Sequence, residues 1–412
     1  MRINKLTLSN GLRLVHHLDT STQMVALNIV YDVGARDEHP LHTGFAHLFE
    51  HLMFGGSAHI PDYDTPLQQA GGENNAWTNN DITNYYLTVP RANVETAFWL
   101  ESDRMLELAF SEQSLEVQRG VVMEEFKQRC LNQPYGDVGH LLRPLAYKVH
   151  PYQWPTIGKE LSHIADATLD EVRRFFFRFY APNNAVLAVI GNISWDDTVR
   201  LTEKWFAPIP RRDVPVRNLP QEPEQTAERR LTVERNVPVD ALFMAWHMCA
   251  RGEPDYYAFD ILSDILSNGR SSRLNRRLVQ EQKLFSSIDA YISGSRDAGL
   301  LQLSGKPAAG VSLQQAEDAV WRELDELCRV PIGEAELEKV KNKFESTQIF
   351  GNINYLNVAT NLAWYELTGK AEDIDLEVGN YRAVTPEQLQ AVATDAFRRE
   401  NTSVLYYKRK DQ

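Results

Sequence analysis

Two histidines and a glutamate stand close together near residue 50, in the order His47-Leu-Phe-Glu50-His51. On a helix, residues four apart project from the same face, so both imidazoles can share one ion. Neutral imidazoles suit zinc, and a catalytic zinc site has three protein ligands and one open position. Zinc acidifies water and polarises a carbonyl group, while Glu50 is placed to accept the proton. The pattern predicts one Zn²⁺ per chain and hydrolytic chemistry.

The segment 114–126 offers two carboxylates for the third ligand, Glu124 and Glu125. At about 100° per residue, Glu125 falls among apolar residues, with Val121 on one side, so we expect it to point inward. Glu124 lies at the margin of that apolar arc and is expected in solvent. An inward carboxylate is unfavourable unless it is paired or bound to metal. We therefore predict that Glu125 completes the site, the alternative being an inward glutamate paired with an arginine.

The elements around these residues follow a repeated order. Strand patterns cover 25–33 and 241–247, each followed by a helix pattern, over 43–54 and 256–266, and 185–190 is typical of a buried strand. The Pro-rich polar segment 208–230 indicates a linker between the two halves. We predict an α+β fold with related domains over 1–207 and 231–412.

Together these motifs resemble the pitrilysin and insulin-degrading enzyme family, in which a glutamate about seventy residues beyond H-x-x-E-H completes the metal site. The resemblance spans nearly the whole chain and includes three further runs: Gly71-Gly-Glu-Asn-Asn-Ala-Trp-Thr-Asn-Asn-Asp-Ile-Thr-Asn-Tyr85, Tyr180-Ala-Pro-Asn-Asn-Ala185, and Asp255-Tyr-Tyr-Ala258 leading to Ser272-Arg-Leu274. It implies two homologous domains, each a mainly antiparallel sheet covered by helices, facing across a cleft. The implied activity is zinc-dependent endopeptidase cleavage of oligopeptides or unfolded polypeptides. The length is similar to that of small bacterial and mitochondrial-processing subunits.

The same resemblance assigns a role in substrate binding to Asn75, Ala76 and Trp77. They would form an edge strand that receives the peptide backbone, because an unpaired strand edge offers main-chain hydrogen bonds with little side-chain preference. In the alternative interpretation, Asn75 and Asp81 only shape turns. The sequence leaves both interpretations open.

The second half departs from the family pattern. Asp260, Ser263 and Asp264 stand where the first half has its two histidines and glutamate, so we expect no second zinc site. In the family, an Arg and a Tyr seven residues apart reach across the cleft to the substrate, but Val279 and Ser286 occupy these positions. A valine cannot donate to an oxyanion.

We therefore expect a hetero-oligomer with a homologous subunit that supplies the Arg-Tyr pair. We favour it over a homodimer in which Arg276 or Arg277 substitutes. Gln118, seven residues before Glu125, replaces a glutamate that relatives often place near the metal, and we assign it to the metal's outer shell.

The remaining composition narrows the class of protein. A formal charge of −13 argues against nucleic acid as a partner, and no apolar run is long enough to span a membrane. No signal peptide is seen, so we predict a cytoplasmic protein, or a periplasmic one if a signal was trimmed. Cys130, Cys249 and Cys328 lack disulfide or zinc-cluster spacing. The competing hypothesis is a non-catalytic scaffold subunit of the same fold.

Overall fold

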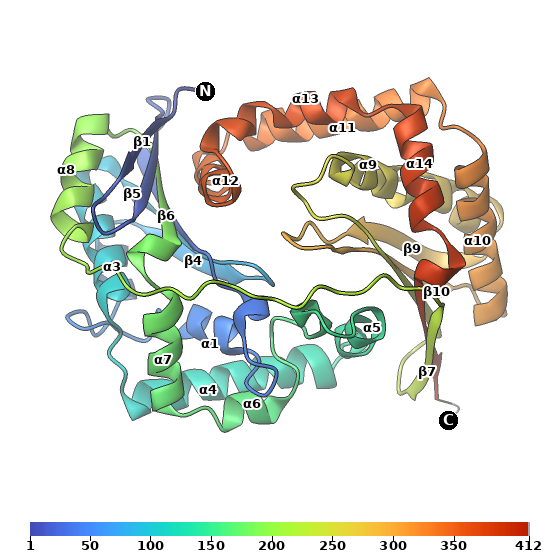
Figure 1. Cartoon of the computed structure of the whole chain (residues 1–412), viewed down its shortest axis with the longest axis horizontal. Helices are drawn as coiled ribbons and strands as arrows, with labels where there is room; N and C mark the ends of the chain where they lie inside the picture. The colour runs from blue at the N-terminus through green and yellow to red at the C-terminus, as the bar shows by residue number, and fades with distance from the viewer. Residues whose placement is uncertain (411–412) are drawn as a thin grey trace. The chain divides into compact units, whose positions relative to one another are not determined.

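The computed structural model describes residues 1–410, which form two compact units. The first unit comprises residues 1–127, 154–219 and 348–377, and the second comprises 128–153, 220–347 and 378–410. Each unit contains one β-sheet covered by helices (Figure 1). The predicted α+β class with two sheet-and-helix domains is confirmed. Within the described residues, no helix is both long and apolar enough to cross a membrane.

The first unit is built on a six-stranded sheet in the order β1-β2-β6-β3-β5-β4. All neighbouring strands are antiparallel except the parallel pair of β2 and β6. The strands are β1 (Asn4–Thr7), β2 (Arg13–Leu18), β3 (Met24–Tyr31), β4 (Glu73–Thr78), β5 (Thr83–Pro90) and β6 (Ala185–Gly191). β4 is therefore the last strand at one edge of this sheet.

The second unit repeats this arrangement with five strands in the order β7-β11-β8-β10-β9. Again one pair, β7 with β11, is parallel and the rest are antiparallel. The strands are β7 (Arg229–Arg235), β8 (Ala241–His247), β9 (Phe285–Ile292), β10 (Leu300–Pro307) and β11 (Thr402–Arg409). In the strand order β2-β6-β3-β5-β4, each neighbouring pair is parallel or antiparallel as in β7-β11-β8-β10-β9. The two units therefore share one sheet topology, which supports the duplication suggested by the amino-acid sequence.

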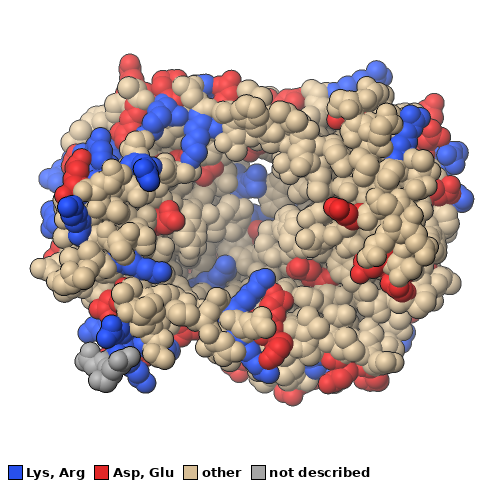
Figure 2. Space-filling model, turned by 180° about the vertical axis from the view of Figure 1, so that it is seen from behind, with Lys and Arg blue, Asp and Glu red and all other residues tan. Residues whose placement is uncertain are grey.

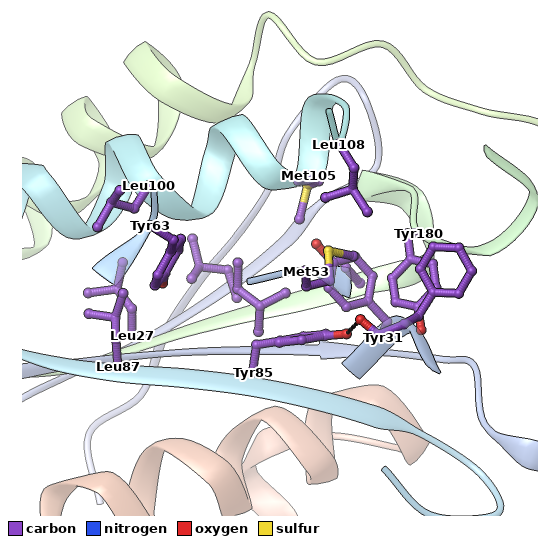
Figure 3. Packing of buried hydrophobic residues seen from close by; sticks show 14 of the residues in the cluster. Leu27, Tyr31, Met53, Tyr63, Tyr85, Leu87, Leu100, Met105, Leu108 and Tyr180 are labelled. Atoms are coloured by element: carbon purple, nitrogen blue, oxygen red, sulfur yellow. Dashed lines mark hydrogen bonds between the residues drawn. The ribbon is translucent and has the colours of Figure 1, made fainter. Parts of the chain in front are cut away.

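Both faces of the first sheet are buried. Along β6, Leu187 and Val189 join the larger core, whereas Val186, Ala188 and Ile190 contact the opposite core. The alternation of a strand places successive side chains on opposite faces, so a strand covered on both sides is apolar throughout. Figure 3 shows part of the larger core, in which tyrosines, leucines and methionines of the sheet and its helices interlock.

The helices that cover the first sheet come from distant parts of the chain. On the larger core lie α1 (Phe45–Leu52), α3 (Val94–Leu106) and α8 (Trp195–Phe206), and the other face is covered by α12 (Tyr355–Thr368) (Figure 1). The unit also contains α2 (Asp64–Gln69), α4 (Glu112–Phe126), α6 (Leu161–Ala165) and α7 (Leu169–Phe179).

In the second unit, α9 (Tyr256–Ser267), α10 (Leu313–Arg329) and α14 (Pro386–Ala396) form one core with the sheet. The opposite face is covered by α5 (Val138–Ala146), which comes from the first half of the chain. α11 (Glu334–Gly351) and α13 (Glu377–Ala383) begin in one unit and end in the other. Each half of the sequence therefore gives one helix, α5 or α12, to the sheet of the other half.

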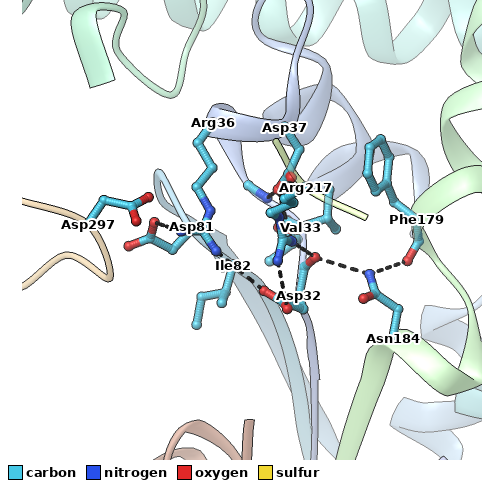
Figure 4. A network of polar contacts seen from close by, with 12 residues as sticks. Asp32, Val33, Arg36, Asp37, Asp81, Ile82, Phe179, Asn184, Arg217 and Asp297 are labelled. Carbon is cyan, nitrogen blue, oxygen red and sulfur yellow. Dashed lines mark hydrogen bonds and ion pairs between the residues drawn. The ribbon is translucent and has the colours of Figure 1, made fainter. Parts of the chain in front are cut away.

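The Pro-rich segment contains the change from first to second unit at residues 219 and 220. It is extended and anchored: Arg217 Nε donates to Asp37 Oδ1 at 2.6 Å, and its Nη1 lies 2.8 Å from Asp32 Oδ2 (Figure 4). The domain limits 1–207, 208–230 and 231–412 stay a prediction about the homologous halves. Because α5 and α12 are exchanged, the compact units are not continuous in sequence.

Charged side chains of both signs lie on the surface that Figure 2 shows, with broad uncharged areas between them. Acidic and basic groups are interspersed there, and the basic ones form no continuous band. Cys130, Cys249 and Cys328 form no disulfide within the described residues.

Candidate metal centre

The helix α1 carries His47, Glu50 and His51 on a body of apolar residues. Leu48 and Phe49 are fully buried, and the hydroxyl of Tyr85 on β5 donates to the Phe49 carbonyl oxygen at 3.0 Å. Tyr85 belongs to the larger core (Figure 3). His47 is buried and His51 is half-buried. The apolar faces therefore hold α1 against the sheet, while the potential ligands lie on its remaining side.

The helix α4 supplies the third group. It begins at the N-cap Ser111, whose side chain accepts from the amide of Ser114, and it packs against α1. Near its end, Glu125 is turned inward with 19% of its side chain exposed, whereas Glu124 is 55% exposed and lies 3.4 Å from Lys127 Nζ. The prediction that Glu125 points inward and Glu124 lies in solvent agrees with these exposures. The expectation that Val121 belongs to the apolar arc is wrong: its side chain is exposed.

Three ligand atoms meet between the two helices. Oε2 of Glu125 lies 3.5 Å from Nε2 of His47 and 3.3 Å from Nε2 of His51, and one atom from each residue lies within 4.8 Å of the others. These separations exceed ordinary hydrogen-bond lengths. Ligand atoms about 2.1 Å from a tetrahedral zinc ion lie about 3.4 Å apart. The donor set and its spacing therefore fit one zinc ion.

Glu50 lies on the same helix but outside this group of three and is half-buried. Burial raises the pKa of Tyr85 well above its usual range, and the negative charge of Glu50 adds to this shift. Burial likewise raises the pKa of Tyr180, again with a contribution from Glu50. Both phenols stay protonated at neutral pH. The role of Glu50 as proton acceptor stays a prediction.

The predicted edge strand is present. Asn75, Ala76 and Trp77 lie in β4, paired on one side with β5, and β4 ends the sheet on the other side. β4 also contacts α1, the helix of the candidate ligands. The Asn75 side chain accepts from the amide of Ala76 at 2.8 Å, so it shapes its own strand. The edge position is an observation, and substrate binding by these residues stays a prediction.

The turn after β4 is fixed by a buried ion pair. Arg36 Nη1 lies 3.3 Å from Asp81 Oδ1, and both side chains are almost fully buried (Figure 4). Asp81 therefore stabilises the turn after β4. Gln118 is half-buried on α4 near Gly55, and its role toward a metal stays a prediction.

The equivalent helix of the second unit, α9, has no such group. The carboxylate of Asp260 accepts from the Tyr381 hydroxyl at 2.6 Å, and Asp264 pairs with Lys343 at 3.2 Å. Among residues 1–410, His47, His51 and Glu125 form the one candidate cluster of three metal-ligating side chains.

The positions of the missing Arg-Tyr pair are structural in the second unit. Val279 packs against its core, and the Ser286 hydroxyl donates to the Lys306 carbonyl oxygen at 3.1 Å. Of the two arginines nearby, Arg277 is held by Glu323 and Glu326 of α10 at 2.7 and 2.6 Å. Arg276 is exposed and lies 3.8 Å from Glu281. The substitution of the missing Arg by Arg276 or Arg277 stays a prediction.

Comparison with known families decides the relationship. Residues 13–158 match the family model described as insulinase, peptidase family M16, and residues 166–344 match the model described as the M16 inactive domain. The chain belongs to the M16 family of peptidases. The predicted relationship to the pitrilysin and insulin-degrading enzymes is confirmed, as is the small-subunit type.

Several M16 relatives match over nearly their whole length. The zinc protease PqqE of Helicobacter pylori is 27% identical over 98% of this chain and 92% of its own. The uncharacterized zinc protease YmxG of Bacillus subtilis is 27% identical over 96% of both chains, and the mitochondrial-processing peptidase subunit beta of Lentinula edodes is 24% identical over 98% and 87%. The crystal structure of a protease from Helicobacter pylori has a TM-score of 0.94 at 26% identity, covering 99% of both chains.

Glu38, close to this M16 centre, is not among the residues predicted from the sequence. Glu38 is buried six residues before the N-cap Gly44 of α1, and its carboxylate accepts from the amides of Gly44 and Ala46, both at 2.9 Å. Burial raises the pKa of Glu38 to about 8, against the opposing effect of these two donors. The charged run Arg36-Asp37-Glu38 before an apolar helix was the available signal.

Proposed function

We propose that this chain is a zinc-dependent endopeptidase that hydrolyses oligopeptides or unfolded polypeptides. The observation that carries the proposal is the approach of Glu125 to His47 and His51 at the spacing of ligands around one zinc ion. A structural zinc site is normally closed by four protein ligands, whereas three ligands leave a position open for catalysis. The names of the relatives as zinc proteases support the same activity.

Each residue of the centre has a defined task in this proposal. His47, His51 and Glu125 hold the ion, and Gln118 is assigned to its outer shell. Zinc, when bound, supplies Lewis acidity that polarises a carbonyl group and acidifies water. Glu50 accepts the proton of the attacking water and passes it to the amine nitrogen that leaves when the C–N bond breaks. The edge of β4 at Asn75, Ala76 and Trp77 receives the substrate backbone as an additional strand.

We further propose that full activity requires a homologous partner subunit. Val279 is packed into its own core, Ser286 is bonded to a neighbouring strand, and Arg277 is held by two glutamates. All three side chains are already engaged within the second unit, and loss of an oxyanion donor lowers kcat by roughly 10²–10³-fold. A partner carrying the Arg-Tyr pair would restore this function; a homodimer would depend on Arg276 or Arg277.

The test separates metal binding from chemistry. Glu50→Gln removes the proton acceptor without changing any of the three ligands, so it should keep about one zinc per chain and lose peptide cleavage. His51→Gln should lose both, and Glu124→Gln, at the exposed neighbour of Glu125, should keep both. Cleavage by Glu50→Gln at the wild-type rate would contradict the proposal.

A scaffold function is the second candidate, favoured by the missing Arg-Tyr pair and by the match of residues 166–344 to a domain described as inactive. A scaffold has no need of an open metal position. If the wild-type chain binds no zinc and cleaves no peptide even with its partner subunit, the scaffold function is the correct one.

A further inference from the structure

A short 3-10 turn connects the two parts of the candidate site. The helical turn η1 (Ala35–Asp37) follows Gly34 and precedes Glu38. On one side its backbone bonds the β4–β5 turn: the amide of Ala35 donates to the Asn79 carbonyl oxygen at 3.1 Å, and that of Arg36 to the Asn80 carbonyl oxygen at 2.9 Å. The approach is close, since a Cβ atom on Gly34 would lie 2.5 Å from the Asn80 carbonyl oxygen.

Side chains strengthen this attachment. Arg36 pairs with Asp81 at 3.3 Å, and these side chains are 4% and 3% exposed (Figure 4). The side chain of Asn79 accepts from the amides of Asp81 and Ile82 at 2.8 and 2.9 Å. The turn at the end of β4 is therefore fixed by buried charge and by backbone contacts to η1.

On its other side, the same segment holds the start of α1. The N-cap of α1 is Gly44, with φ +89°, and it has no side chain to satisfy the first amides of the helix. A side chain is unfavourable there because φ is positive and a Cβ atom would lie 2.9 Å from the Ile157 carbonyl oxygen. The carboxylate of Glu38 takes over the capping, with one oxygen on the amide of Gly44 and the other on that of Ala46, next to His47.

We propose that the segment from Gly34 to Glu38 is a positioning device that sets the metal-binding helix α1 in register with the substrate-binding edge strand β4. Glu38 acts through the start of α1, and Arg36 acts through Asp81 and the turn that ends β4. Neither residue is assigned a contact with metal or substrate. This inference rests on the proposed function, because the register matters only if α1 holds zinc and β4 receives the peptide.

The physical reason is the precision that hydrolysis demands. A misplacement of about 1 Å between a reacting group and its substrate can lower the rate roughly 10²-fold. Two of the three ligands lie on α1, and the scissile bond would be held by β4, so a rigid link between these two elements contributes to the distance from the ion to the carbonyl carbon. The segment holds the start of α1 and the turn that follows β4. Direct packing between α1 and β4 adds to this alignment.

The two attachments can be loosened separately. Glu38→Gln replaces one of two accepting oxygens by an amide that cannot accept from a backbone N–H. Asp81→Asn removes the charge that pairs with Arg36. His39→Gln and Asp213→Asn change exposed residues and serve as matched controls. Glu38→Asp keeps a carboxylate one methylene shorter, and it also provides a folded variant if Glu38→Gln does not fold.

The experiment combines hydrogen exchange of the metal-free chain with zinc titration and peptide kinetics. Glu38→Gln should speed amide exchange at the start of α1 roughly tenfold, as expected for loss of a helix cap, and weaken zinc affinity while leaving KM unchanged. Asp81→Asn should speed exchange in the β4–β5 turn and raise KM while leaving zinc affinity unchanged. Glu38→Asp should lie between wild type and Glu38→Gln.

Two results would overturn the inference. One is unchanged exchange of α1 and of the turn in both variants. The other is an equal effect of both variants on zinc affinity and KM, as a general loss of stability would produce. Failure of the proposed function is distinguished by the wild-type chain: if it binds no zinc and cleaves no peptide, that function fails, and the positioning role in catalysis fails with it, whatever the exchange rates show.

Discussion

Oε2 of Glu125 lies 3.3 Å from Nε2 of His51, although the two residues come from separate helices. The packing of α4 on α1 creates this approach, and it brings the same oxygen to 3.5 Å from His47. A buried or half-buried carboxylate beside two imidazoles is expected to serve a cation, since it is otherwise unfavourable. The centre is thus a property of the tertiary fold.

The adjacent glutamates of α4 permit a matched comparison. Glu125→Gln should weaken zinc affinity by at least about 100-fold, because loss of outer-shell partners alone weakens metal binding roughly 10–100-fold. Glu124→Gln changes a side chain that is 55% exposed and should leave the affinity unchanged. Zinc titration against a competing chelator measures both. Equal affinities in the two variants would remove Glu125 from the ligand set.

A partner subunit should change the kinetics of the chain. Addition of a homologous subunit that carries the Arg-Tyr pair should raise kcat/KM by roughly 10²–10³-fold, the effect of an oxyanion donor. The control is the same partner with its Arg replaced by Ala, which should assemble without activating. Peptide hydrolysis by the purified chain at its full rate, with no partner present, would refute the division of labour.

Backbone recognition by β4 predicts how modified substrates behave. N-methylation of a peptide amide that pairs with the strand should raise KM roughly tenfold, since it removes one hydrogen bond and adds bulk. The same modification outside the bound segment is the control, and side-chain changes at alternate positions should have smaller effects. If N-methylation at every position leaves KM unchanged, β4 does not receive the substrate as a strand.

Breaking the buried ion pair between Arg104 and Glu101 should strongly destabilise the first unit. Arg104 and Glu101 on α3 are each 1% exposed, and the Arg104 guanidinium lies 4.5 Å from the ring centroid of Tyr85. Arg104→Met leaves the Glu101 charge without its partner and should lower the free energy of unfolding by about 3–5 kcal/mol. Chemical denaturation of the full chain measures this change.

Two further variants serve as controls for the loss of stability in Arg104→Met. Replacing Glu101 and Arg104 together by Leu and Met should be less harmful than Arg104→Met alone, because no uncompensated charge remains. Arg200→Met breaks an exposed pair with Asp197 and should cost less than about 1 kcal/mol. If Arg104→Met were as mild as Arg200→Met, the buried pair would not support the core.

Much of the fold was predictable from local patterns. The strands expected at 241–247 and 185–190 coincide with β8 and β6 within one residue, since continuous apolar runs bounded by Gly or polar residues have few other solutions. The choice of Glu125 over Glu124 followed from helical geometry. The exposure of Val121 did not, because helical periodicity gives directions around α4 and cannot show where the packed face ends.

Contacts between segments far apart in the chain could not be predicted from the sequence. The exchange of α5 and α12 between the two sheets depends on which apolar face covers which sheet, and both helices have suitable faces. The capping of α1 by Glu38 joins residues on either side of a loop, and only the fold shows that Gly44 needs an external cap. Local reasoning fails wherever distant segments satisfy one another's polar groups.

The most direct test of the zinc centre is anomalous X-ray scattering at the zinc edge from crystals of the chain grown with zinc. The proposed site predicts one strong peak about 2.0–2.2 Å from Nε2 of His47, Nε2 of His51 and Oε2 of Glu125, with one open position occupied by solvent. The absence of a peak between the two imidazole rings, or Glu125 turned away from an ion bound there, would contradict it.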